Sequence, residues 1–311
     1  MVATQLLSPI GAAGLTSDLD LSTSELRALL NLAAEVKRAP RDFRRDLESK
    51  SAALLFEKPS LRTRLTFELA VQQLGGSVVT VEGPIGQREP LQDVARNLGR
   101  WVDIIVARTF AQSTVDGLAH WSRIPVVNAL SDRYHPCQAL ADMQTLAEHF
   151  GSFENRTLAF VGDGNNVAHS LMLCAARLGL NFRIATPQGY EPDAEIVAQA
   201  RQFASASGSG IFLSHDPAEA VTGANAIYTD VWASMGQESE AAQRRRIFRP
   251  YQVNDELFSL APDALFMHCL PAKRGEEVTD EVMESPRSIA FDQAENRLHA
   301  QKALLLMLLA A

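Results

Sequence analysis

The chain has 311 residues, enough for two domains of ordinary size, and 46% of them are hydrophobic. With 29 Lys and Arg against 37 Asp and Glu, the formal net charge is -8, which argues against a nucleic-acid-binding protein. The three cysteines are far apart and lack metal-ligand spacing, so they indicate a reducing compartment. The first 26 residues contain no Lys or Arg, and no apolar run is long enough to span a bilayer. We therefore expect a cytoplasmic protein without a membrane partner.

The first half of the chain alternates strand-like and helical patterns. Residues 1–16 read as a loose tail, and the capping box Ser22-Thr23-Ser24-Glu25 opens a helix that ends near Pro40. Apolar runs that predict strands, each followed by a turn or a helical pattern, lie at residues 52–56, 77–81, 104–107 and 125–128. This alternation predicts a parallel sheet covered by helices on both faces.

A second strand and helix series follows a helical pattern that runs from His135 to Phe150. Further strands are predicted at residues 158–161, 182–185, 211–214, 226–229 and 264–267. The last helix begins near Asp292, and its continuous apolar end favours burial against the first domain. We therefore expect an α/β fold of two parallel-sheet domains, residues 1–150 and 151–291, with a C-terminal helix, residues 292–311, returning to the first.

The stretch Phe56-Glu57-Lys58-Pro59-Ser60-Leu61-Arg62-Thr63-Arg64 follows a buried strand and opens a helix. Pro59 disfavours a longer strand, and Ser60 is a good N-cap. The N-terminus of a helix presents free N–H groups and the positive end of the dipole, which favour an anion. Arg62 and Arg64 add guanidinium donors. The residue types alone leave two readings open: a phosphate site, or a capped helix with two solvated arginines.

Pro-Ser-x-Arg-Thr-Arg after an apolar strand resembles the carbamoyl-phosphate loop of the aspartate and ornithine carbamoyltransferases. The usual form of this loop has Thr where Leu61 stands, so one hydroxyl is absent, although the backbone N–H at that position remains. The resemblance implies that carbamoyl phosphate contacts Ser60, Leu61, Arg62 and Thr63. It makes residues 1–150 the carbamoyl-phosphate-binding domain and residues 151–291 the ornithine-binding domain.

The motif His135-Pro136-Cys137-Gln138 is similar to the family residues that line the carbamoyl group. A lone His at a helix start is more often a cap or a core residue. The resemblance implies that His135 donates to the carbamoyl oxygen and that Gln138 holds the amino group, while Cys137 packs. It also brings Arg297, at the start of the last helix, to carbamoyl phosphate, and Arg108 to the oxyanion.

Two motifs of the second domain resemble the ornithine branch of the family. Val161-Gly162-Asp163-Gly164-Asn165-Asn166 follows a strand; a dinucleotide fingerprint needs a third small residue where Val167 stands, and a plain tight turn is the remaining alternative. Asp-x-x-x-Ser-Met-Gly, here Asp230 to Gly236, is the more discriminating motif. The resemblance implies that ornithine is bound by Asn166, Asp230, Ser234 and Met235.

His268-Cys269-Leu270-Pro271 also ends a predicted strand. A buried structural Cys is the usual outcome for such a residue. The resemblance places this turn against the reacting amine, with a cis Leu-Pro bond, and assigns Cys269 and Leu270 to the carbamoyl-phosphate site as well. Residues 273–277 read as a mobile, solvated loop, and the family pattern gives this loop a role in closing over substrate.

The resemblance, which extends from about residue 20 to the C-terminus, implies an ornithine carbamoyltransferase of arginine metabolism. Carbamoyl phosphate and L-ornithine would give L-citrulline and phosphate, without a metal or another cofactor. The residues with catalytic roles would be Arg62, Arg108, His135, Asp230 and Cys269. Two alternatives stay open: a carbamoyltransferase for a modified ornithine or putrescine, and a catalytically silent paralogue that only binds ligands.

The family also implies a homotrimer, or a multiple of trimers. In the family, a loop equivalent to residues 82–90 offers a Gln or His to a neighbouring subunit's phosphate. Here Pro84 stands at that position, and Gln87 or Arg88 is the candidate replacement.

Overall fold

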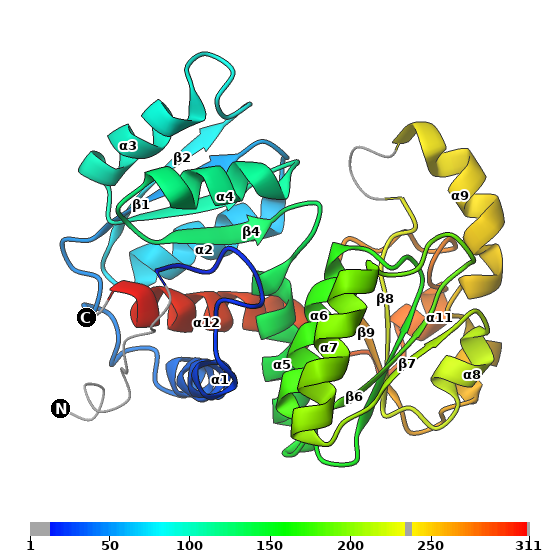
Figure 1. Cartoon of the computed structure of the whole chain (residues 1–311). Coiled ribbons are helices and arrows are strands. Elements are labelled where there is room, and N and C mark those ends of the chain that lie inside the picture. The colour runs from blue at the N-terminus through cyan, green and yellow to red at the C-terminus, as the bar shows by residue number, and fades with distance from the viewer. Residues whose placement is uncertain (1–12, 234–237, 310–311) are drawn as a thin grey trace. The chain divides into compact units, whose positions relative to one another are not determined.

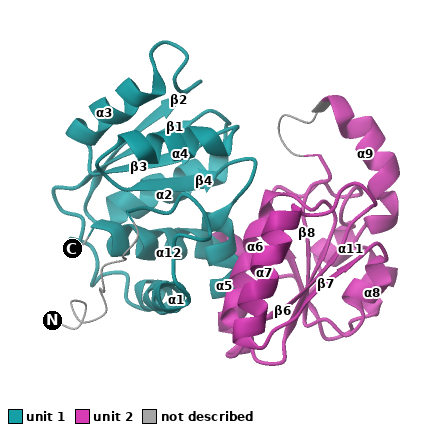
Figure 2. Ribbon diagram, viewed as in Figure 1, with its two compact units in different colours: residues 1–144, 295–311 teal, residues 145–294 magenta. Residues whose placement is uncertain are grey.

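The computed structural model describes residues 13–233 and 238–309 (Figure 1). The chain divides into two compact units, one of residues 1–144 with 295–311 and the other of residues 145–294 (Figure 2). The expected fold class is confirmed, because each unit contains a parallel sheet with helices packed on it.

The first unit is built on a four-stranded sheet in the order β2-β1-β3-β4. Its strands are β1 (Ser51–Phe56), β2 (Ser77–Glu82), β3 (Ile104–Arg108) and β4 (Val126–Leu130). The helices are α1 (Thr23–Arg38), α2 (Leu61–Gln73), α3 (Leu91–Trp101), α4 (Gln112–Trp121) and α5 (Pro136–Phe150). Phe56 pairs with Glu82 and with Arg108, so β1, β2 and β3 end at the same level of the sheet. The segments after these strands therefore share one edge.

Apolar side chains explain why these segments fold as they do. In β1 and β3 nearly every residue is buried, as expected for strands that are covered on both faces. Leu55, Ile105 and Ala107 form a cluster with α3 and α4, against which Ile85 and Leu91 pack. The capping box at Ser22 is present, with Glu25 bonded back to the Ser22 N–H. The expectation of a loose tail up to residue 16 is wrong at its end, since Leu15 is buried and its N–H bonds to the Val126 carbonyl.

The second unit contains a five-stranded sheet in the order β7-β6-β5-β8-β9. Its strands are β5 (Thr157–Val161), β6 (Asn181–Ala185), β7 (Ile211–Ser214), β8 (Ala226–Thr229) and β9 (Leu265–His268). The helices are α6 (Asn166–Leu178), α7 (Ala194–Ser207), α8 (Pro217–Val221), α9 (Ala241–Phe248), α10 (Asp255–Ser259) and α11 (Asp280–Met283), with 3-10 turns at Glu238–Glu240 and Arg249–Tyr251. Strands β5, β8 and β9 are neighbours, so the segments that follow them also share one edge.

The C-terminal helix α12 (Ala290–Leu309) returns to the helices of the first unit, as expected. Lys37 of α1 donates to Asn296 at 2.9 Å, and Lys302 donates to Gln73 of α2 at 2.6 Å. The apolar C-terminal end of α12 is buried. No helix in the described part of the chain is long and apolar enough to cross a bilayer.

Candidate active site

The β1–α2 turn places a helix N-terminus at the edge of the first sheet. Ser60 occupies the N-cap position with extended backbone angles, and its side chain makes no capping hydrogen bond within the described chain. The first N–H groups of an α-helix have no partner inside the helix. Leu61 is the first residue of α2; its side chain is exposed, so it contributes only its backbone N–H to the turn.

The two arginines of the turn have different surroundings. Arg64 donates to Glu68 at 2.9 Å and to Glu82 at 2.6 Å, and these contacts raise its pKa. The expectation that Arg64 adds a donor to an anion site is therefore wrong, because two carboxylates already hold its guanidinium. Across residues 13–233 and 238–309, no side chain pairs with the guanidinium of Arg62. Of the pair, Arg62 is the one with donors to offer an anion.

Two further guanidinium groups converge on the hydroxyl of Thr63, which is buried in the first turn of α2. Arg297 of α12 donates to Thr63 Oγ1 at 3.0 Å, and Arg108, at the end of β3, lies 3.5 Å from the same oxygen. Residues separated by more than 200 positions thus meet at one helix N-terminus. Their charges add to the positive end of the helix dipole and make this part of the first unit strongly electropositive.

His135 and Gln138 complete this group at the start of α5. Gln138 accepts from Arg297 at 2.7 Å and donates to Asp142 at 2.8 Å. Burial lowers the pKa of His135 well below 6.5, and the nearby Arg297 and Arg108 charges lower it further. His135 is therefore a neutral imidazole that can donate from one ring nitrogen. Burial raises the pKa of the Cys137 thiol to about 12, in keeping with a packing role.

In the second unit, the β5–α6 turn places two asparagines at the edge of the sheet. A Cβ on Gly164 would lie 2.3 Å from the Pro192 nitrogen, so only glycine fits there. Asn165 caps α6 by accepting from Val167 at 3.0 Å, and Asn166 is the first residue of the helix. These features account for the turn through backbone packing and capping.

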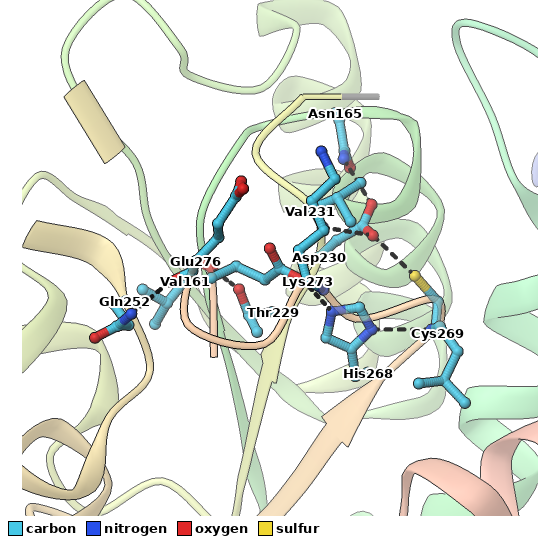
Figure 3. Close-up of polar contacts among 12 residues, drawn as sticks. Val161, Asn165, Thr229, Asp230, Val231, Gln252, His268, Cys269, Lys273 and Glu276 are labelled. Carbon is cyan, nitrogen blue, oxygen red and sulfur yellow. Dashed lines mark hydrogen bonds and ion pairs between the residues drawn. The ribbon is translucent and has the colours of Figure 1, made fainter. Parts of the chain in front are cut away.

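Asp230, directly after β8, is held by donors from three segments (Figure 3). Its Oδ2 accepts from the Asn165 amide at 2.9 Å, and its Oδ1 accepts from the Val231 N–H at 2.8 Å and from Cys269 Sγ at 3.0 Å. The three segments follow β5, β8 and β9, whose ends are adjacent in the sheet. This arrangement gives the carboxylate and the thiol a fixed common position.

The turn after β9 is supported by a buried pair. His268 Nδ1 accepts from the Leu270 N–H at 2.9 Å, so Nε2 carries the proton and donates to Glu277 at 3.3 Å. Glu277 also accepts from the Lys273 N–H at 2.5 Å and is fully buried. The expectation of a solvated residue 277 is therefore wrong. The Leu270–Pro271 bond is cis, as expected.

One group of possible metal ligands occurs in the described chain: Asp230, His268 and Cys269, with ligand atoms within 4.8 Å of one another. Both nitrogens of His268 are already engaged in hydrogen bonds. A cation would have to displace the Leu270 N–H or Glu277 from the ring, and so the donor set is a poor fit for a metal.

Arg244 of α9 is buried and bonds to the segments that follow β5 and β8. It donates to Asp163 at 2.7 Å, to the Trp232 carbonyl at 3.0 Å and to Glu240 at 3.0 Å. Burial raises the pKa of Asp163 to about 6, against the lowering effect of Arg244, so the pair is ionised at neutral pH. Neither Arg244 nor Asn165 was among the residues that the sequence predicted at the site.

The predicted residues thus form one group within each unit. In the first unit, Arg297 contacts both Thr63 and Gln138, and Arg108 lies near Thr63. The charges of both arginines act on His135, and the backbone of residues 60–62 lies beside Thr63. Asn166, Asp230, Cys269 and Leu270 lie along one sheet edge in the second. Ser234 and Met235 lie outside the described residues.

Comparison with known proteins identifies the class. Residues 14–148 match the family model "Aspartate/ornithine carbamoyltransferase, carbamoyl-P binding domain", and residues 154–308 match the model "Aspartate/ornithine carbamoyltransferase, Asp/Orn binding domain". The chain therefore belongs to the aspartate/ornithine carbamoyltransferase family.

Individual relatives agree with this assignment. An ornithine carbamoyltransferase from Parafrankia sp. (strain EAN1pec) is 51% identical over 299 residues, which cover 94% of each chain. The solved ornithine carbamoyltransferase from Pyrococcus furiosus is similar with a TM-score of 0.92 and 48% identity, covering 97% of this chain and 98% of that one. An N-acetyl-L-ornithine transcarbamylase mutant complexed with PALAO has a TM-score of 0.83 and 34% identity, covering 92% of this chain and 97% of that one.

Proposed function

We infer that the chain is an ornithine carbamoyltransferase, which converts carbamoyl phosphate and L-ornithine to L-citrulline and phosphate. The observation that carries this function is the meeting of Arg108 and Arg297 at Thr63, on a helix N-terminus that a carbamoyl-phosphate domain would use. The higher identity to a relative named for ornithine than to one named for N-acetyl-L-ornithine supports the free amino acid as substrate.

For carbamoyl phosphate we propose a site made by the first domain, residues 1–150. The phosphate would be bound by Ser60, Arg62, Thr63 and the N–H groups that start at Leu61, because guanidinium and helix N–H donors match phosphate oxygens. His135 would donate to the carbamoyl oxygen, and Gln138 would accept from the carbamoyl amine. Arg297 would reach the carbamoyl phosphate from α12.

The second domain, residues 151–291, would hold ornithine. Asn166, Asp230, Ser234 and Met235 are the proposed contacts of its α-amino and α-carboxyl groups. Asp230 and Cys269 would also orient the reacting side-chain amine, with Cys269 and Leu270 contacting the carbamoyl group. The hydrogen bond that joins Cys269 Sγ to Asp230 supports a shared role for these two residues.

The proposed chemistry is acyl transfer to an amine. A free alkylamine has a pKa of about 10.4, so only about 0.4% of it is neutral at pH 8, and the site must select that form. Attack on the carbamoyl carbon gives a tetrahedral oxyanion, which Arg108, Thr63 and His135 would stabilise. One donor of this kind typically lowers the activation barrier by about 3 kcal/mol. The C–O bond to phosphate then breaks, and the departing phosphate would accept the extra proton of the attacking nitrogen, which leaves a neutral citrulline urea nitrogen.

A radiometric or colorimetric assay of the carbamoylated product with four amines tests the function. We expect citrulline from L-ornithine, and at least a hundredfold lower rates with N-acetyl-L-ornithine, putrescine and L-aspartate. Preference for one of the other amines would reassign the substrate. Absence of phosphate release with every amine would instead indicate the silent paralogue.

For the assembly we propose a homotrimer or a multiple of trimers in the cytoplasm. Support comes from apolar side chains that the single chain leaves exposed on α2 and on the edge strand β2. They are Leu61, Leu65 and Leu69, four residues apart along one helix face, and Val79 and Val81 on one face of the strand. The two groups lie on different faces of the sheet, because Thr80, between the valines, bonds to Glu68 of α2. Exposed apolar groups of this kind mark protein interfaces.

A further inference from the structure

Glu57, the residue directly after β1, makes hydrogen bonds to the segments that follow β2 and β3. The proposed reaction assigns no role to these bonds. The backbone N–H of Glu57 donates to the Arg108 carbonyl at 2.9 Å. Its carboxylate accepts from the Ile85 N–H at 3.0 Å through Oε1, and from the Phe110 N–H at 2.9 Å through Oε2. One side chain therefore joins the segments after β1, β2 and β3.

These bonds continue the sheet past the point where its ladder ends. The last ladder-like bond between the β1 and β2 segments runs from the Gly83 N–H to the Phe56 carbonyl. Beyond it, the N–H groups of residues 85 and 110 are bonded by the Glu57 carboxylate instead of by a neighbouring strand. Hydrogen bonds to an ionised acceptor are about twice as strong as neutral ones. The carboxylate thus takes the place of a β1 partner for both segments, while the segment after β3 still pairs on its other side through the Thr109 N–H and the Leu130 carbonyl.

Arg108 is the residue most affected, because Glu57 fixes the chain directly after the Arg108 Cα at two points. The backbone N–H of Glu57 holds the carbonyl of Arg108, and the carboxylate holds the N–H two residues later. Lys58 adds a contact to the same segment, with its ammonium 4.7 Å above the Phe110 ring. The direction in which the Arg108 side chain leaves β3 toward Thr63 is set by this short stretch of backbone.

The charge of Glu57 points to the same conclusion. At a sheet edge that binds a dianion, a nearby carboxylate weakens the attraction for the ligand. Glu57 is half-buried, and both of its oxygens are directed to backbone N–H groups. Its contribution to the site must therefore come from the backbone it holds, against an adverse electrostatic effect.

We propose that Glu57 is a positioning residue for the carbamoyl-phosphate site, which acts by holding the segments of Ile85 and of Arg108–Phe110 against the β1–α2 turn. The proposal rests on the proposed function for its kinetic test. It requires no contact between Glu57 and the substrate.

The test compares Glu57→Gln and Glu57→Ala with a control, Glu48→Gln, which removes the same charge from an exposed residue of the same unit. Positioning predicts that Glu57→Ala raises KM for carbamoyl phosphate at least tenfold and lowers kcat, with KM for ornithine changed less than threefold. Gln keeps one acceptor oxygen and should rescue part of the loss. A purely electrostatic role predicts the opposite sign, since removal of the charge would then lower KM for carbamoyl phosphate.

A second measurement does not depend on activity. Amide hydrogen exchange should accelerate at least tenfold at residues 85 and 110 in Glu57→Ala, while strand β4 keeps its protection. Unchanged kinetics with faster exchange would overturn the positioning role, and unchanged exchange would overturn the contacts on which it rests. If the protein itself shows no carbamoyl transfer, the proposed function fails, whereas the exchange result still decides whether Glu57 holds these segments.

Discussion

At the scale of single residues, the two arginines of the β1–α2 turn show how surroundings decide a role. Arg64 is neutralised by Glu68 and Glu82, whereas Arg62 has no such partner in the described chain. Both side chains have the same intrinsic chemistry, so their difference comes from the carboxylates that the fold brings near. Only Arg62 keeps its donors for a phosphate.

We therefore expect Arg62→Lys to lower kcat/KM for carbamoyl phosphate by two orders of magnitude or more. A guanidinium binds phosphate through a planar fork of two N–H groups, which a lysine ammonium does not reproduce. The matched control is Arg64→Lys, for which kcat/KM should fall less than threefold. Steady-state kinetics at saturating ornithine measures both, and circular dichroism checks that both variants fold. Near-normal activity of Arg62→Lys would remove this residue from the site.

His135 gives a prediction about pH. Its pKa in the folded protein is well below 6.5 through burial and then through Arg297 and Arg108. Below pH 6.5 the unfolded chain takes up a proton at this residue and the folded chain does not, so acid lowers the free energy of unfolding. The slope is about 1.4 kcal/mol per pH unit for one proton, and it ends at the lower pKa of the folded state.

The measurement is the stability difference between the protein and His135→Asn at pH 7.5 and pH 5.5, from denaturant unfolding. The remaining histidines are common to both proteins, so their contributions cancel. We expect the advantage of the unmodified protein to shrink by at least 1 kcal/mol over this range, on the order of the slope above. A difference that stays constant would mean that His135 is protonated in the folded protein near its ordinary pKa.

At the scale of elements, the sequence predicted the features that depend on residues close together in the chain, namely the strands and the helix starts. Apolar runs located all nine strands of the described chain, and capping residues located the starts of α1 and α2, because both signals are local. The short helices α8 to α11 were not predicted, since four to eight residues carry too little periodicity.

Contacts between residues far apart in the chain could not be predicted from the sequence alone. Arg244 and Asp163 are 81 positions apart, and nothing near either residue signals the other. The burial of Glu277 depends on His268, whose tautomer is set by the turn after β9. The group around Thr63 could be predicted only through resemblance to a family, because it combines residues from β3, α2, α5 and α12.

The position of Arg244 between the segments after β5 and β8 leads to a third prediction. Arg244→Lys keeps the charge but cannot reach Asp163, Glu240 and the Trp232 carbonyl together. We expect KM for ornithine to rise about tenfold, since Asp163 and Trp232 are close neighbours of Asn165 and Asp230, while KM for carbamoyl phosphate stays within a factor of two. The loss of one or two charge-assisted hydrogen bonds accounts for a change of this size in KM.

The control for Arg244 is Arg246→Lys, an exposed arginine on the same helix. It should leave both KM values unchanged. Equal increases of both KM values in Arg244→Lys would point to a general loss of structure, and unchanged values would show that this ion pair has no part in ornithine binding.

At the scale of the whole molecule, the single chain leaves two groups of apolar side chains uncovered, one on α2 and one on β2. Leu65 and Leu69 are 45% and 41% exposed, and Val79 and Val81 are 61% and 52% exposed. Strand β2 is at the edge of its sheet, where an uncovered apolar strand is a liability unless another chain covers it. A site that needs a residue from a neighbouring copy would also make activity depend on assembly.

We therefore expect Leu65→Glu combined with Leu69→Glu to dissociate the proposed trimer into monomers and to lower activity in parallel. A charge in the centre of an apolar interface loses its hydration without gaining a partner, which costs several kcal/mol. Light scattering coupled to gel filtration gives the mass of the assembly, and citrulline formation gives the activity. The control, Leu260→Glu, changes a residue that is 40% exposed in the other unit, and this variant should keep the mass of the unmodified protein. A double variant that keeps the trimer would place the interface elsewhere, and an active monomer would show that each chain holds a complete site.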